Sequence, residues 1–152
     1  MVVDSSVLIA ILLGEPEADY YSKRLANTDD IYISAVSIVE SSMVIEYKRG
    51  EQGAKEFDEL LEVITPTIIS FDTEQAKLAR IAWRQFGKGR HPAKLNFGDC
   101  CSYAVAKYIN KPLLFKGNDF SRTDLIPAWP NPDPRPKPPW LPDQEYRGLA
   151  GF

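Results

Sequence analysis

The sequence predicts an α/β fold of three layers (αβα), in which helices cover both faces of a mainly parallel central sheet of four to five strands. Two observations lead to this fold class. Short apolar segments alternate along the chain with segments whose apolar residues recur at helical spacing. The chain also has 152 residues, 44% of them hydrophobic and 26% charged, which is typical of a single globular domain with its own core.

The first half of the chain alternates strands and helices. A strand at Met1 to Asp4 leads into a helix that contains Val7 to Leu13. Pro16 fits the first turn of the next helix. Ser34 is a suitable N-cap for a later helix, and Gly50 suits its end. The remaining elements are expected as a helix at 16–26, a strand at 31–33 and helices at 34–49 and 52–64.

The second half repeats this alternation. Thr67 to Phe71 is β-branched and aromatic, as strands are. Asp72, with Gln75 three residues later, fits a capping arrangement for a helix that ends near Phe86. We expect Trp83 of this helix and Met43 of the earlier helix to be core residues. A loop at 87–92, a helix at 97–109 and a strand at 113–115 follow. Such repeated units place the ligand crevice beyond the carboxyl ends of the strands.

The chain divides into a domain at residues 1–128 and a Pro-rich C-terminal extension at residues 129–152. Eight of the twelve prolines fall between Pro127 and Pro142, a density that excludes helix and central strand. We expect an extended segment whose Trp129 and Trp140 pack against the domain or a partner.

Cysteine use and hydropathy favour a cytoplasmic protein without membrane contact. Cys100 and Cys101 are adjacent and cannot form a disulfide framework, which favours a reducing compartment. No basic leader of a signal peptide is visible at the N-terminus. The longest apolar run, Val7 to Leu13, is far shorter than the roughly 20 residues that span a membrane.

Four acidic residues lie where a solvated surface acid is not expected, and they are Asp4, Glu40, Asp99 and Asp119. Carboxylates gathered from distant segments repel one another and lose hydration, so such a cluster normally needs a cation or a proton between its members. Each also has a purely structural explanation. Asp4 could cap a helix, Glu40 could form a buried salt bridge, Asp99 could cap a helix together with Asn96, and Asp119 could stabilise a turn.

Other chemistries are poorly supplied by this chain. A single histidine, His91, provides neither a zinc site nor a two-histidine ribonuclease mechanism. Glycines at 87 and 89 lack the spacing of a phosphate-binding P-loop. From Phe86 to Arg122, however, basic residues outnumber acids, which could guide a polyanion toward the site, although lysines that merely solvate helices are an equal alternative. The candidate substrate contacts are Ser6, Lys88, Arg90, Lys116 and Asn118.

Four segments of the sequence resemble the motifs of PIN-domain ribonucleases, particularly the VapC toxins of bacterial toxin–antitoxin modules. They are residues 2–10 around Asp4, Ile38-Val39-Glu40, residues 95–100 around Asp99 and residues 113–120 around Asp119. The resemblance covers residues 1 to about 128. It implies that the four acids form the family's acidic quartet, with Asp119 the least uniformly essential. It further implies a PIN-like fold, Mg²⁺ or Mn²⁺ as cofactor, a homodimer, and a small antitoxin that inserts into the catalytic groove.

Residue chemistry and resemblance agree on metal-assisted phosphodiester hydrolysis, and the resemblance implies that the activity is that of an endoribonuclease. Oxygen ligands suit Mg²⁺, which usually takes one or two carboxylates directly. We expect Asp4 and Asp99 to be these ligands, with Glu40 and Asp119 holding waters of the metal or a second ion. Two rival hypotheses are a non-catalytic PIN-like protein-interaction module and a metal-dependent phosphatase of similar topology. The phosphatase normally has a second aspartate at the position of Ser6.

Overall fold

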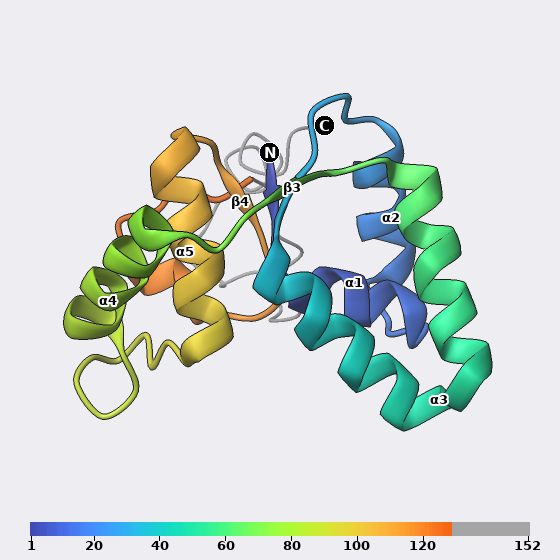
Figure 1. Cartoon of the computed structure of the whole chain (residues 1–152), viewed down its shortest axis with the longest axis horizontal. Helices are drawn as coiled ribbons and strands as arrows, with labels where there is room; N and C mark the ends of the chain where they lie inside the picture. Colours follow the sequence, from blue (N-terminus) through green and yellow to red (C-terminus); the bar gives the residue numbers. More distant parts are fainter. Residues whose placement is uncertain (129–152) are drawn as a thin grey trace, which may run out of the picture.

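The computed structural model describes residues 1–128, which form three layers (Figure 1). Four short strands make one parallel sheet in the order β3-β2-β1-β4, which confirms the predicted fold class. The strands are β1 (Val2–Val3), β2 (Tyr32–Ser34), β3 (Thr67–Ile69) and β4 (Leu113–Leu114), and the helices are α1 (Ser5–Leu12), α2 (Ala18–Ala26), α3 (Ala35–Ile64), α4 (Thr73–Phe86), α5 (Phe97–Ile109) and the 3₁₀ turn η1 (Phe120–Arg122).

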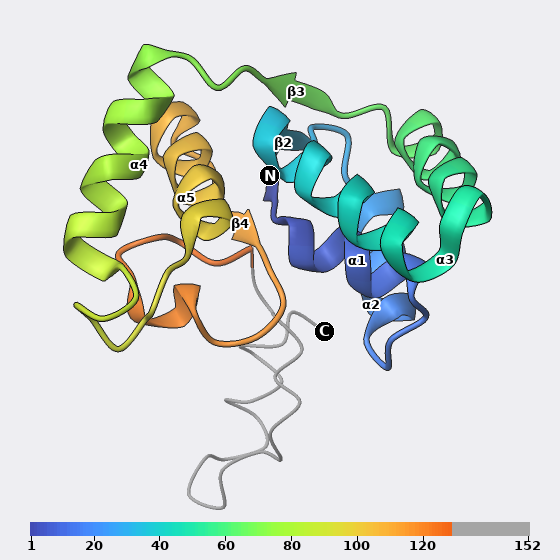
Figure 2. The ribbon, with the colours of Figure 1, turned by 60° about the horizontal axis from the view of Figure 1, so that its bottom comes forward.

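The sheet separates two hydrophobic cores. Val3 and Leu114 face the core beneath α1, α2 and α3, whereas Val2 and Leu113 face the core beneath α4 and α5. Successive residues of a strand point to opposite faces, so even two-residue strands contribute to both cores. Figure 2 shows the same division, with α4 and α5 together on one side and α1 to α3 on the other.

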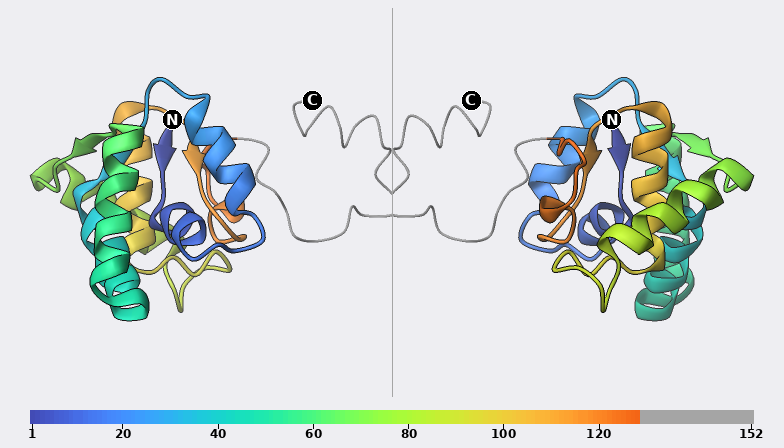
Figure 3. Two further views of the ribbon diagram at one scale, coloured as in Figure 1. Left: turned by 90° about the vertical axis from the view of Figure 1, so that its right-hand side faces the viewer. Right: turned by 90° about the vertical axis from the view of Figure 1, so that its left-hand side faces the viewer.

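Parallel pairing brings the carboxyl ends of the strands to one edge of the sheet. Figure 3 shows β1 running from the N-terminus directly into α1 at that edge. Asp4 follows β1 and is the N-cap of α1, while Ser34 ends β2 and is the N-cap of α3. Lys116 and the loop that carries Asp119 follow β4. The predicted crevice therefore lies where three connections leave the sheet.

Two predictions about the helices differ from the structure in detail. The helices expected at 34–49 and 52–64 form the single element α3, which is broken at Gly50, where φ is 62° and ψ is −152°. Gly50 thus ends the first segment as predicted, but the second begins without a loop. Met43 and Trp83 are not core residues, since 66% and 42% of their surfaces are exposed. Each side chain instead lines an apolar groove, Met43 together with Val39 and Trp83 together with Phe71.

Within residues 1–128, no helix is both long and apolar enough to cross a membrane. The predicted Pro-rich extension, with Trp129 and Trp140, lies outside the described residues.

Candidate metal-dependent active site

Asp4 is buried at the carboxyl end of β1, with 2% of its surface exposed. Its Oδ2 accepts hydrogen bonds from the backbone N–H of Ser6 at 3.0 Å and from the Ser6 hydroxyl at 2.6 Å. Its Oδ1 accepts a third bond from the hydroxyl of Ser102 at 2.6 Å. Asp4 therefore caps α1, which was the purely structural explanation considered for this residue. The same bonds fix its carboxylate in one orientation, so capping does not exclude a second role.

Ser102 is a functional candidate that the sequence analysis missed. It is fully buried in α5 and its hydroxyl lies 3.1 Å from the equally buried hydroxyl of Ser37 in α3. Ser102 thus connects Asp4 to a second helix through a short chain of hydroxyl groups. Its position three residues after Asp99 places it one helical turn along α5, which is the sequence signal that could have found it.

Glu40 lies half-buried on α3, next to the first turn of α5. Its Oε2 is buried and has no hydrogen-bond partner, and among the described residues no ion pair includes Glu40. The salt-bridge explanation therefore fails within residues 1–128. Burial raises the pKa of the Glu40 carboxyl, a hydrogen bond from Ser5 lowers it by less, and the charge of Asp4 raises it further.

Gly98 makes the close approach of Glu40 possible. A Cβ atom on Gly98 would lie 2.4 Å from Oε2 of Glu40 and 2.8 Å from its Cδ, so any other residue here would force the Glu40 carboxylate to move. Gly98 was not among the site residues predicted from the sequence. Glycine lowers the stability of a helix because it loses more backbone freedom than other residues on folding. At position 98 it also allows α3 and α5 to come into close contact.

Asp99 closes a capping box at the start of α5. Its backbone N–H donates to Oδ1 of Asn96 at 2.9 Å, and its Oδ2 accepts from the Asn96 N–H at 2.7 Å, as the structural alternative predicted. Burial nevertheless raises the pKa of Asp99 to about 7. The Asn96 bond opposes this shift, and the charges of Asp4, Asp119 and Glu40 add to it.

The four acids thus act on one another electrostatically, from β1, α3, α5 and the loop after β4. Asp119 is exposed and precedes η1 without capping it through its side chain. Among residues 1–128, no three acidic, histidine or cysteine side chains lie close enough to hold one ion between them. A cation at this site would therefore take one or two carboxylates directly and complete its coordination with water, which is the usual pattern for Mg²⁺. The oxygen-only donors and the unpartnered Oε2 of Glu40 fit such an ion.

A model of the PIN domain matches residues 1–126 of the chain. The chain belongs to the PIN-domain family. A protein named Ribonuclease VapC from Mycolicibacterium smegmatis is 45% identical over 125 residues, which cover 82% of this chain and 97% of the relative. This PIN domain is therefore of the VapC type.

Solved structures agree on the fold of this PIN domain. The sarcin-ricin loop cleaving toxin VapC20 of Mycobacterium tuberculosis superposes with a TM-score of 0.71 at 15% identity and covers 85% of this chain and 98% of its own. VapBC2 of Rickettsia felis, bound to a DNA fragment from its promoter, gives a TM-score of 0.66 at 21% identity over 82% of this chain and 94% of the matched chain.

The predicted substrate contacts of the PIN domain lie in different surroundings. Lys88 and Arg90 are exposed on the loop after α4, where the Arg90 guanidinium lies 4.0 Å from the centre of the Trp83 ring. Asn118 is exposed beside Asp119. The Ser6 hydroxyl, in contrast, bonds Asp4 and the backbone, and Lys116 pairs with two glutamates.

Two apolar grooves of the PIN domain share Phe97 in their lining, and one of them includes Glu40 of the acidic site. One groove, of about 520 Å³, is lined by Glu40 and Gly98 together with Val39 and Met43. The other, of about 490 Å³, is lined by Phe71, Trp83 and the α4 face. Phe97 is 66% exposed, and its ring centre lies 6.3 Å from that of Phe71. Apolar surface of this extent next to a polar site is typical of a protein-binding face.

Proposed function

We propose that this PIN domain is the toxin of a type II toxin–antitoxin pair and a metal-dependent endoribonuclease. The observation that supports the proposal is the electrostatic influence of the other three acids on Asp99, whose pKa is raised to about 7 by burial and by the charges of Asp4, Asp119 and Glu40. The 45% identical relative is named a ribonuclease, which supports RNA as the substrate.

Asp4 and Asp99 would hold the cation, which we propose to be Mg²⁺ or Mn²⁺. When bound, such an ion stabilises the negative charge that develops on a phosphate during hydrolysis. Asp4 is the fixed ligand because three hydrogen bonds hold its carboxylate, whereas Asp99 offers the oxygen that the capping box leaves free.

Glu40 is our candidate for the general base that accepts a proton from the attacking water. Its Oε2 has no hydrogen-bond partner, and burial raises its pKa, which makes the carboxylate a better proton acceptor. Asp119, exposed at the edge, would orient water or a second ion. Lys88, Arg90 and Asn118 are proposed contacts to the RNA backbone, because all three residues are exposed at the surface.

The partners we propose are an antitoxin and a second copy of the chain. The matched chain of Rickettsia felis comes from a VapBC2 complex, which supports an antitoxin. Exposed Val39, Met43, Trp83 and Phe97 provide apolar surface for one or both of these partners.

Metal removal tests the proposed activity directly. The purified chain should cleave total cellular RNA at discrete sites with Mg²⁺ or Mn²⁺, lose cleavage in chelator, and regain it when the cation is restored. An identically purified Glu40→Gln variant controls for contaminating nuclease. Cleavage that resists chelation, or none with either cation, would contradict the proposal. Antitoxin binding without any cleavage would favour the interaction module, and turnover of a phosphomonoester would favour the phosphatase.

Replacing Gly98 with alanine tests the role of Glu40. The new Cβ would displace the Glu40 carboxylate, so we expect cleavage to fall at least about tenfold, because small misplacements of reacting groups have effects of this size. Stability should change little, since alanine favours the helix and the displaced group is a side-chain end. Kinetics and thermal unfolding of Gly98→Ala, Glu40→Gln and the double variant check this. If the double variant is clearly worse than both single variants, Gly98 does not act through Glu40.

A further inference from the structure

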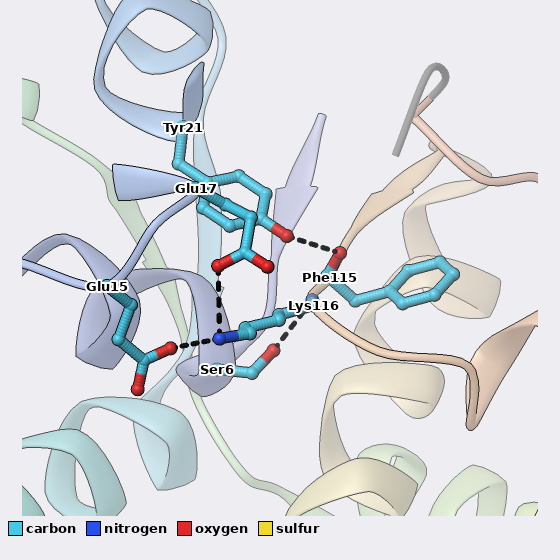
Figure 4. Close-up of polar contacts among 6 residues, drawn as sticks. All are labelled: Ser6, Glu15, Glu17, Tyr21, Phe115 and Lys116. Atoms are coloured by element: carbon cyan, nitrogen blue, oxygen red, sulfur yellow. Dashed lines mark hydrogen bonds and ion pairs between the residues drawn. The ribbon is translucent and has the colours of Figure 1, made fainter. Parts of the chain in front are cut away.

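Lys116 has two different connections, one through its backbone and one through its side chain. Figure 4 shows the backbone N–H pointing to Ser6, while the side chain runs between Glu15 and Glu17. The N–H donates to the Ser6 hydroxyl at 3.0 Å, and that hydroxyl donates to Asp4. The ammonium pairs with Glu15 and lies 3.2 Å from Glu17 Oε2. Lys116 therefore joins the acidic site to the connection between α1 and α2.

We propose that the ion pairs of Lys116 with Glu15 and Glu17, called here the Lys116 clamp, position the loop that carries Asp119, and that Lys116 is a positioning residue and not an RNA contact. Lys116 is three residues before Asp119, and Gly117 between them has a φ of 87°, a conformation that few other residues adopt. The proposal rests on the proposed nuclease function and names the residues that hold its site together.

The surroundings of the Lys116 ammonium favour the clamp over a phosphate contact. Only 31% of the Lys116 side chain is exposed, against 13% for Glu17. The hydrogen bond to Glu15 is the main cause that raises the pKa of Lys116. An RNA phosphate would have to displace two carboxylates already in contact with this cation, and both would then repel the phosphate.

A second contact fixes the same end of β4 from α2. The hydroxyl of the buried Tyr21 donates to the carbonyl of Phe115 at 3.3 Å (Figure 4). The α1–α2 region thus holds two successive residues, Phe115 by its carbonyl and Lys116 by its side chain and amide. Beyond them the chain enters the loop at 117–119, in which Asn118 and Asp119 are exposed, so the clamp holds the chain at the start of this loop.

Opposite effects on RNA binding distinguish the two roles of Lys116. One variant is Lys116→Met, which keeps the aliphatic stem, and the other is Glu15→Gln with Glu17→Gln, which frees the lysine. If the clamp positions the loop, both variants should lower kcat about tenfold with little change in KM. If Lys116 binds phosphate, Lys116→Met should raise KM while the double glutamine variant lowers it, and that result would overturn the proposal.

The matched control variants remove the same number of charges as the clamp variants, but from helices α3 and α4. Glu51→Gln with Glu59→Gln neutralises two exposed acids of α3, which corrects for the general effect of net charge on RNA affinity. Lys77→Met removes the exposed pair with Glu74 on α4. Neither control should change kcat.

Hydrogen exchange tests the clamp independently of nuclease activity. The amides of residues 116–119 should exchange about tenfold faster in Lys116→Met and in the double glutamine variant than in the wild type or the Lys77→Met control. If the wild-type chain cleaves no RNA but these amides still respond, the proposed function fails and the clamp stands. Unchanged exchange in both clamp variants would overturn the clamp.

Discussion

Asp99→Asn is expected to reduce RNA cleavage on the order of a thousandfold and, at the same time, to raise the melting temperature of the metal-free protein by about 3 °C or more at pH 8. Activity falls because a proposed cation ligand is lost. Stability rises because asparagine carries no charge into a site where burial and three nearby carboxylates raise the pKa of Asp99 to about 7. The asparagine carbonyl can still accept the Asn96 N–H bond.

The stability gained by the Asp99→Asn substitution should increase with pH, because the pKa of Asp99 is raised in the folded protein. Asp99 has a folded-state pKa above its ordinary value of 3.8, so its ionisation costs stability as the pH rises from about 4 through 7. The difference between Asp99→Asn and wild type should therefore be largest above pH 7 and vanish near pH 4. Thermal unfolding of both proteins across this range, in chelator, measures it.

A capping aspartate outside the site provides the control. Asp72 accepts the Gln75 N–H at 2.9 Å at the start of α4, and Asp72→Asn should not raise the melting temperature. Adding Mg²⁺ at pH 8 should stabilise the wild type and not Asp99→Asn, because only the wild type retains both proposed ligands. Full cleavage by Asp99→Asn, or a fall in its melting temperature at pH 8, would contradict this account.

The fold was predictable because its signals are local. Apolar β-branched segments, capping residues such as Ser34 and Asp72, and Gly50 each act within a few residues of their own position. Alternation of these elements then restricts the sheet to a parallel arrangement. The four acids could be singled out as site candidates for a related reason, since each follows a strand or lies in a helix at a place where a solvated surface acid is not expected.

The features that were missed depend on contacts between distant segments. Ser102 bonds Asp4 across 98 residues, and Lys116 pairs with glutamates about 100 residues away. Neither partner is visible in a local pattern. The burial of Met43 and Trp83 was also predicted wrongly, because both are exposed. Helical spacing predicts which residues share a face of a helix, but not whether another element covers that face.

Asp4→Asn is expected to abolish cleavage as Asp99→Asn does, but to lower the melting temperature by about 3 °C or more. Asp4 accepts three hydrogen bonds as a buried carboxylate, and bonds to a charged acceptor are stronger than bonds to a neutral one. An asparagine amide would also turn an N–H group toward a serine hydroxyl, which would have to give up its role as donor. The protein should still fold, because Ser6 and Ser102 can rotate their hydroxyls.

Opposite changes in stability from the same substitution at Asp4 and Asp99 would separate the two carboxylates by role. Asp4 would then act as both a structural hydrogen-bond acceptor and the proposed ligand, whereas ionised Asp99 would lower stability. Adding Ser102→Ala gives the matching test, since the loss from Asp4→Asn should shrink once the Ser102 hydroxyl is absent. If both asparagine variants stabilise the protein equally, the hydroxyl bonds do not hold Asp4 in the way the structure indicates.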